Sequence, residues 1–185
     1  MTEMSMHKIL VLFAHPALQK SLVNKSLFNE IQDIEGITCH DLYDIYPDSF
    51  INIKQEQRLL LQHDIIVFQF PLYWYSSPAI LKEWQDLVLE HGFAYGEGGD
   101  KLTGKRFMLA ISTGGSENSY SSDGYNDHEI DDFLLPFCKM SQICNMEYLN
   151  PFILHDIHKR HEPQRIARKA QQYRDRLLVL QQEGI

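Results

Sequence analysis

The sequence is poor in cysteine, in long apolar runs and in basic residues. Its three cysteines are too few for a disulfide framework, which suits a reducing cytoplasm. The apolar runs have the length of strands, so no transmembrane helix is expected. The formal net charge of −8 argues against a general nucleic-acid binder, because phosphate contacts need clustered lysine and arginine. Residues 1–8 lack the apolar stretch of a signal peptide, so we expect a cytoplasmic protein.

Strong motifs for metals and phosphates are also missing. No Walker motif or glycine-rich phosphate motif occurs. The histidine-containing tract His155–Pro163 looks like a metal site, but no cysteine lies nearby and Pro163 indicates a loop before the last helix. We therefore predict no metal site, and keep His155, which ends a strand, as a candidate to reach a crevice. Cys138 and Cys144 are expected in the core.

The sequence does contain a regular alternation of apolar, strand-like runs and helical periodicity. Strands are expected at 8–13, 37–42, 64–70, 105–111 and 148–154. Helices are expected from the Ser21 N-cap through Ile34, at 54–62, at 78–89, around 130–138 and from Ile166 to Leu180. Pro136 must kink the fourth of these helices unless it lies near the start. No linker or repeat interrupts the pattern, so residues 1–185 are predicted to form a single domain.

This alternation predicts an α/β fold in which helices cover both faces of a parallel sheet. Right-handed crossovers favour a doubly wound, flavodoxin-like sheet of five strands in the order 2-1-3-4-5. In that order the ends of strands 1, 3 and 4 open onto one crevice, where ligands of such sheets bind. The three unusual loops of the sequence follow these three strands.

The loop after the first strand, 14–24, ends where a helix begins. Unpaired N–H groups and the helix dipole favour an anion there, with Ser21 and Asn24 as additional donors and Lys20 as a source of charge. Taken alone, this loop is more simply explained as an ordinary helix start with Ser21 as the N-cap.

The loop after the third strand carries three consecutive aromatic residues, Tyr73, Trp74 and Tyr75, where a loop is normally small and polar. Its side chains suit the face of a flat, conjugated ligand, and its N–H groups suit the polar edge of such a ligand. Packing in the core or at a subunit interface is an alternative of equal weight.

The loop after the fourth strand contains Thr113, Gly114 and Gly115, followed by Tyr120. Paired glycines allow the backbone to approach a ligand closely, and a tyrosine hydroxyl can stabilise a developing anion. A flexible surface turn would have the same composition. The coincidence of three such loops at adjacent strand ends favours a binding site.

Together these residues resemble the NAD(P)H dehydrogenase (quinone) family of flavodoxin-like flavoproteins, over nearly the whole chain. The similarity rests on Ala14-His15-Pro16, Ser21-x-x-Asn24, Phe70-Pro71-Leu72-x-Trp74, Pro78-Ala79-Ile80-Leu81-Lys82, Gly92-Phe93-Ala94-Tyr95 and Thr113-Gly114-Gly115. Within the family, the ancillary proteins of bacterial glutathione-regulated potassium-efflux systems are the most similar. That similarity rests on His40-Asp41-Leu42-Tyr43, Tyr46-Pro47-Asp48 and Leu81-Lys82-Glu83-Trp84.

The resemblance implies a role for each matching position. The flavin's phosphate and ribityl side would be held by His15, Ser21, Leu22, Val23 and Asn24, and its ring would be lined by Pro71, Leu72, Tyr73, Trp74 and Tyr75. Its pyrimidine edge would be contacted by Thr113, Gly114 and Gly115. The two catalytic positions would be Tyr120 and Asn126. Phe93 and Tyr95 would reach the active site of a partner subunit, which implies a homodimer.

The implied activity is hydride transfer from NAD(P)H through flavin N5 to a quinone or a related electrophile. The implied cofactor is FMN, with FAD as the alternative. Asn126 stands where quinone reductases of the family have a histidine, and asparagine cannot become cationic. His128 could compensate only if the loop is arranged differently.

Two further functions stay open beside the reductase. A regulatory subunit of a membrane potassium/proton antiporter would lie at the inner membrane through that partner, with or without turnover. A one-electron carrier of the flavodoxin type fits the acidic charge, but it does not fit the loop chemistry.

Overall fold

The computed structural model describes residues 6–157 and 162–183 of the chain. Its strands are β1 (Ile9–Phe13), β2 (Ile37–Asp41), β3 (Ile65–Pro71), β4 (Arg106–Ser112), β5 (Glu147–Tyr148) and β6 (Phe152–Leu154). Its α-helices are α1 (Leu22–Asn29), α2 (Leu42–Ile45), α3 (Ile53–Gln62), α4 (Ala79–Val88), α5 (Ile130–Ile143) and α6 (Pro163–Gln182). Two short 3-10 helices, η1 (Leu18–Lys20) and η2 (Glu117–Ser119), lie in loops.

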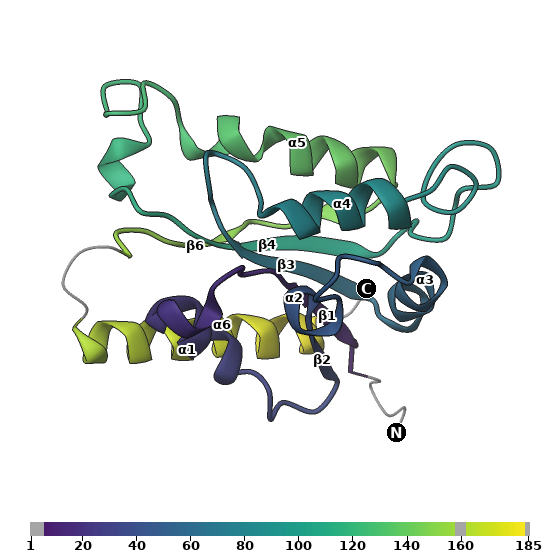
Figure 1. The fold of residues 1–185 in the computed structure, drawn as a ribbon, viewed down its shortest axis with the longest axis horizontal. Coiled ribbons are helices and arrows are strands. Elements are labelled where there is room, and N and C mark those ends of the chain that lie inside the picture. The colour runs from purple at the N-terminus through teal and green to yellow at the C-terminus, as the bar shows by residue number, and fades with distance from the viewer. Residues whose placement is uncertain (1–5, 158–161, 184–185) are drawn as a thin grey trace.

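The sheet is parallel, with the order β2-β1-β3-β4-β5 and with β6 also paired to β4, which confirms the predicted flavodoxin-like topology. Helices cover both faces: α4 and α5 lie on one side and α1 and α6 on the other (Figure 1). Alternate residues of the central strands point to opposite faces of the sheet and pack in two separate hydrophobic cores. Leu10, Phe68 and Leu109 pack under the α2–α5 side, whereas Val11, Val67 and Met108 pack against α1 and α6. Burial on both faces is why these strands read as continuous apolar runs.

The fifth predicted strand, 148–154, is divided into β5 and β6. Tyr148 lies opposite Phe107 and Phe152 lies opposite Ala110, so the register shifts by one residue between the two pieces. Pro151 stands in the interruption, where it has no N–H to donate to β4. A one-residue insertion of this kind is a β-bulge, and it is tolerated at the edge of a sheet.

The first helix ends earlier than predicted, at Asn29 rather than near Ile34. Ile31 and Ile34 are nevertheless buried in the core on the α1–α6 side. Their N–H groups bond three residues back, to Phe28 O and Ile31 O, so tight turns continue to direct these side chains inward. The apolar spacing was therefore a correct signal of burial and a wrong signal of helix length.

Pro136 lies inside α5, which continues as one helix to Ile143. Within the described residues, no helix is long and apolar enough to cross a membrane. The same part of the chain contains no group of three or more His, Cys, Asp or Glu side chains placed to hold a metal ion. The tract His155–Pro163, in which no metal site is predicted, includes residues 158–161, which lie outside the described ranges.

Candidate functional site

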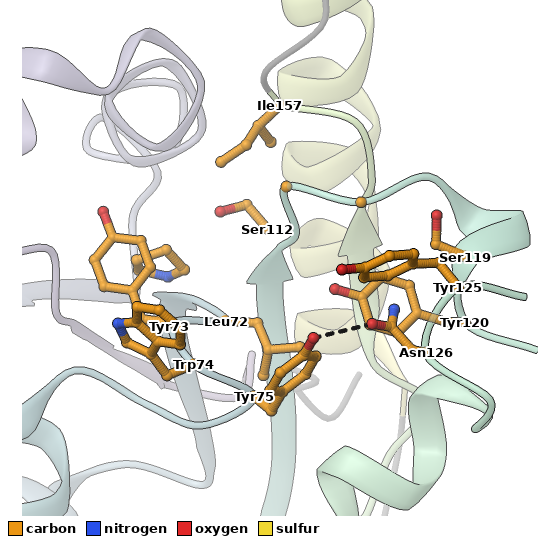
Figure 2. Close-up of a pocket in the computed structure, with 13 residues that line it drawn as sticks. Leu72, Tyr73, Trp74, Tyr75, Ser112, Ser119, Tyr120, Tyr125, Asn126 and Ile157 are labelled. Atoms are coloured by element: carbon orange, nitrogen blue, oxygen red, sulfur yellow. Dashed lines mark hydrogen bonds between the residues drawn. The ribbon is translucent and has the colours of Figure 1, made fainter.

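A cavity of about 350 Å³ opens at the carboxyl ends of β3 and β4, where the fold predicts a ligand site. The aromatic loop after β3 forms one side of it, and the segment around Tyr120 and Asn126 forms the other (Figure 2). The lining residues are Pro71, Leu72, Tyr73, Trp74, Tyr75, Ser112, Gly114, Gly115, Ser119, Tyr120, Tyr125, Asn126 and Ile157. The second and third predicted loops therefore meet at one site.

The aromatic loop is a tight turn with an unfavourable backbone conformation. Tyr73 and Ser76 pair as an antiparallel bridge, and Ser76 N donates to Tyr73 O at 2.9 Å. The two residues between them, Trp74 and Tyr75, have φ values of 49° and 61°. Such turns are normally made by asparagine and glycine, because left-handed backbone costs other residues roughly 1–2 kcal/mol each. Trp74 is nonetheless 94% exposed, so its ring lies open to solvent beside the cavity rather than packed in the core.

Tyr75 connects the two sides of the cavity. Its hydroxyl donates to Asn126 Oδ1 at 3.1 Å (Figure 2). Its ring stacks on Phe133 of α5 with centroids 5.0 Å apart. Since the Asn126 carbonyl accepts this bond, its NH₂ group remains as the donor. A neutral amide can donate to a ligand but cannot supply a full positive charge.

Tyr120 lines the cavity and is only 8% exposed. Its ring packs edge-on against Phe133 and lies over His155 with centroids 5.7 Å apart. Burial raises the pKa of Tyr120, and the neighbouring Thr113 side chain offsets part of that rise. The phenol therefore stays protonated at neutral pH and can act as a donor.

A second pocket, of about 210 Å³, adjoins the first and shares Tyr73 and Ile157 with it. It lies at the N-terminus of α1, and its other lining residues are His15, Ala17, Lys20, Ser21, Leu22 and Val23. Ser21 is the N-cap of α1, as predicted. The first N–H groups of a helix have no partner within the helix, so this pocket suits an anion.

His15 is buried at the junction of the two pockets. Its Nδ1 accepts a hydrogen bond from Ala17 N at 3.1 Å, and its Nε2 lies 3.4 Å from the Tyr73 hydroxyl. Burial lowers the pKa of His15, against a backbone hydrogen bond that raises it. A neutral ring that accepts at Nδ1 carries its proton at Nε2, where it can donate toward the cleft.

Two residues expected to touch a ligand support the site from behind instead. Asn24 is 1% exposed, and its Nδ2 donates at 3.0 Å to Ser21 Oγ and to Ser112 Oγ, so it joins α1 to β4. Thr113 is also 1% exposed, and its hydroxyl donates to Gly115 O at 2.9 Å. Neither lines a pocket with its side chain.

Ser112, Ser119, Tyr125 and Ile157 line the cavity without having been predicted. Tyr125 is 88% exposed, and apart from Tyr120 the rest of its loop is made of small and polar residues, so this contrast was a usable signal. Ile157 follows the last strand, in a segment where only His155 had been considered as a residue that could reach the crevice. No pattern distinguishes Ser112 or Ser119 from other serines in these loops.

Phe93 and Tyr95 do not reach the cavity of their own chain. They lie in the loop between α4 and β4, at the opposite end of the sheet from the η2 loop (Figure 1). Tyr95 is 39% exposed and packs edge-on against His91. A contribution of these residues to a ligand site would therefore require a second copy of the chain.

The donor groups around the two pockets fit a flavin. The N–H groups of Trp74, Tyr75, Gly114 and Gly115 have no hydrogen-bond acceptor within the described part of the chain. They border a cavity with aromatic walls, and the adjoining pocket ends at a helix N-terminus beside Lys20. Such a set would meet the polar edge of a planar ring and a phosphate joined to it.

The family to which the chain belongs is the flavodoxin-like fold family, whose profile matches residues 7–177. This match confirms the expected flavodoxin-like fold, and the relative that follows confirms the resemblance to the potassium-efflux ancillary proteins. The glutathione-regulated potassium-efflux system ancillary protein KefG of Yersinia pestis (strain Pestoides F) is 48% identical over 166 residues. The match covers 90% of this chain and 91% of that protein.

Solved structures show the same fold at substantial identity. The general stress protein 14 of Treponema denticola, in complex with FMN, superposes with a TM-score of 0.89 at 36% identity, covering 94% of this chain and 99% of that chain. An NADPH-quinone reductase from P. pentosaceus gives 0.79 at 33% identity, with 90% and 96% covered. A chain described as a thermophilic tryptophan halogenase from Streptomycin violaceusniger gives 0.89 at 42% identity, with 95% and 99% covered.

Proposed function

We propose that the protein is an FMN-dependent oxidoreductase that transfers a hydride from NAD(P)H to quinones or related electrophiles. The observation that carries this proposal is the pair of adjoining pockets, one walled by Tyr73, Trp74 and Tyr75 and the other at the N-terminus of α1. Two similar structures support this proposal. The Treponema denticola protein, 36% identical, is in complex with FMN, and the P. pentosaceus protein, 33% identical, is an NADPH-quinone reductase. The halogenase description of another neighbour shows that the fold alone does not select a reaction.

The bound flavin would supply the redox chemistry, taking a hydride from NAD(P)H at N5 and giving it to the acceptor. The chain's own residues bind and orient. The aromatic turn would cover the face of the flavin ring, and the N–H groups of Gly114 and Gly115 would donate to its polar edge. The Tyr120 hydroxyl and the NH₂ group of Asn126 would donate hydrogen bonds to oxygen atoms of the flavin or the acceptor that become more negative on reduction.

The phosphate end would be held by the N-terminal N–H groups of α1, Lys20, and the Nε2–H of His15. These groups suit FMN, and FAD is the alternative that mass analysis of released flavin distinguishes.

A steady-state assay tests the reductase. The FMN-loaded protein should oxidise NADPH or NADH in the presence of a benzoquinone, with the flavin bleached by the nucleotide alone and restored by the quinone. A flavin-loaded protein that oxidises neither nucleotide would refute this activity.

We further propose that the protein is a cytoplasmic ancillary subunit of a potassium/proton antiporter, peripheral to the inner membrane through that partner. The 48% identity to KefG over 90% of the chain supports this role. Added to membrane vesicles that contain the co-expressed antiporter, the protein should raise potassium efflux. Stimulation without any nucleotide oxidation would favour the purely regulatory alternative, and robust turnover without stimulation would refute the ancillary role.

Replacement of Trp74 by asparagine should separate folding from flavin binding. Trp74 is 94% exposed, so its removal forfeits little burial, and asparagine tolerates the left-handed backbone better. The free energy of unfolding of the flavin-free protein should rise by about 0.5–1 kcal/mol. The affinity for FMN should fall about tenfold, because stacking on the ring is lost. Denaturant unfolding and a fluorescence titration measure the two effects.

Phe50→Asn is the matched control for the Trp74 substitution. Phe50 is an 83%-exposed aromatic residue outside both pockets, so its removal should leave FMN affinity unchanged. Wild-type FMN affinity in Trp74→Asn would contradict the assigned role of the turn.

A further inference from the structure

His155, at the end of β6, is bonded to the loop that borders the ligand cavity. Its Nδ1 lies 2.8 Å from Thr113 Oγ1, and its ring packs against Tyr120. Thr113 Oγ1 in turn donates to Gly115 O at 2.9 Å. His155 is therefore connected through one residue, Thr113, to the side of the cavity formed by Gly114, Gly115 and Tyr120.

The backbone holds His155 in this position. Thr113 N donates to Leu154 O at 2.9 Å, Ile157 N donates to Thr113 O at 3.1 Å, and Asp156 N donates to Gly115 O at 3.0 Å. Arg165 of α6 adds a bond from its guanidinium to His155 O at 3.0 Å. The residues after β6 are thus paired with residues 113–115 as a continuation of the sheet, which leaves the imidazole little freedom to move away from Thr113.

The hydrogen-bond pattern fixes the protonation of the neutral ring. A threonine hydroxyl has a single hydrogen, and that of Thr113 is donated to Gly115 O. His155 Nδ1 must therefore donate to Thr113 Oγ1, so neutral His155 is the Nδ1–H tautomer and its Nε2 is the site of further protonation.

A separate cavity of about 550 Å³ is also lined by His155 and Tyr120, and water in it could supply protons to the imidazole. The ionisable groups lining it are Glu117 of η2, Glu129 before α5, Asp156, and Arg165 and Lys169 of α6, besides Tyr120. Burial lowers the pKa of His155; Glu117 and Asp156 raise it, and Lys169 lowers it. In the flavin-free protein at neutral pH the ring is therefore mainly neutral.

We propose that His155 is the ionisable positioning residue of this site. It holds Thr113 in place, and it takes up a proton at Nε2 when negative charge develops on the flavin ring bound next to Gly115. The proton comes from solvent in the cavity behind it, the ring becomes an imidazolium, and no proton passes to the ligand. The cation then stabilises that charge through Thr113 and Tyr120. The imidazolium would thus supply the positive charge that Asn126, a neutral residue lining the cavity, cannot supply. This role of His155 rests on the proposed flavin chemistry.

The first test reads the imidazole directly. Two-dimensional ¹H–¹⁵N spectra of the flavin-free protein should show His155 as the Nδ1–H tautomer, with a pKa below that of an unperturbed histidine. With reduced FMN bound, its pKa should rise to near or above neutrality. The Nε2–H tautomer, or an unchanged pKa with reduced FMN, would overturn the proposal.

The second test measures proton uptake on reduction of bound FMN with dithionite, as a function of pH. Between the two pKa values of His155, the wild type should take up as much as about one more proton per FMN than a His155→Asn variant. The reason is that the amide NH₂ of asparagine can replace the Nδ1–H donor to Thr113 but does not titrate. FMN affinity should change less than about threefold in His155→Asn and fall further in His155→Ala, which lacks the donor.

His128→Gln is the matched control, because His128 is an exposed histidine whose Nδ1 lies 3.1 Å from Asn126 O. It should keep the extra proton uptake. If His128→Gln rather than His155→Asn abolishes the uptake, the proposal is wrong. Failure to bind flavin would refute the proposed function, whereas FMN binding with identical uptake in wild type and His155→Asn would refute the role of His155 alone.

Discussion

A Gly115→Val variant is expected to bind FMN at least about 100-fold more weakly than the wild type, a loss of about 2.7 kcal/mol. A Cβ at position 115 would lie 3.3 Å from Tyr120 Cε2 and 3.4 Å from Ser119 Cβ, which is already tight. The two methyl groups of valine need more room, and they find it only by displacing Tyr120 or by entering the cavity that residue 115 lines. Isothermal titration of the flavin-free protein with FMN measures the loss.

Gly104→Ala is the matched control for Gly115→Val. Gly104 precedes β4, with φ of 79° and no heavy atom within 4 Å of an added Cβ. Alanine there strains the backbone by roughly 1 kcal/mol without touching the pockets. The control should therefore lose stability and keep FMN affinity. Wild-type affinity in Gly115→Val would show that the flavin lies elsewhere.

A Glu56→Gln variant is expected to lose about 3–5 kcal/mol of unfolding free energy. Glu56 in α3 is completely buried and accepts hydrogen bonds from three donors. Oε1 lies 2.8 Å from His40 Nε2 and 2.5 Å from the Tyr46 hydroxyl, and Oε2 accepts from Trp84 Nε1 at 2.8 Å. A glutamine would point an NH₂ group at one of these donors. Since Trp84 lies on α4, which follows the aromatic turn, the cluster also anchors the helix leading away from the site.

The same cluster makes a prediction about acid stability. Burial raises the pKa of Glu56, but the hydrogen bonds from His40, Tyr46 and Trp84 outweigh it, so the folded-state pKa lies below that of an unperturbed glutamate. A carboxylate whose pKa is lowered on folding stabilises the protein above its unfolded-state pKa and loses that contribution as the pH falls through its folded-state pKa.

Urea unfolding at pH 7 and at pH 3 tests both statements. Glu56→Gln should be much less stable than the wild type at pH 7, and the difference should shrink toward pH 3. Glu83→Gln, on the exposed face of α4, should unfold like the wild type at both values. A Glu56→Gln protein as stable as the wild type at pH 7 would contradict the assigned role of the cluster.

Sequence periodicity was sufficient for the topology because each central strand is buried on both faces. The apolar runs at β1, β3 and β4 therefore had no competing interpretation. The boundaries that failed have local causes. Pro151 interrupts the last strand within a bulge, and turns bonded three residues back carry Ile31 and Ile34 into the core after α1 has ended.

The position of the site followed from the switch-point rule, since the loops after β1, β3 and β4 surround the two pockets. The direction of individual side chains did not follow. Asn24 and Thr113 have the polar character of ligand contacts, but their hydrogen bonds face Ser112 and His155. Only the three-dimensional arrangement distinguishes a residue that touches a ligand from one that supports its neighbour.

The absorbance spectrum of the purified protein, before and after addition of FMN, tests the central claim most directly. We predict the bands of a protein-bound flavin, a stoichiometry of one flavin per chain, and FMN as the species released on denaturation. A colourless protein that binds neither added FMN nor added FAD would contradict the assignment of these pockets to a flavin.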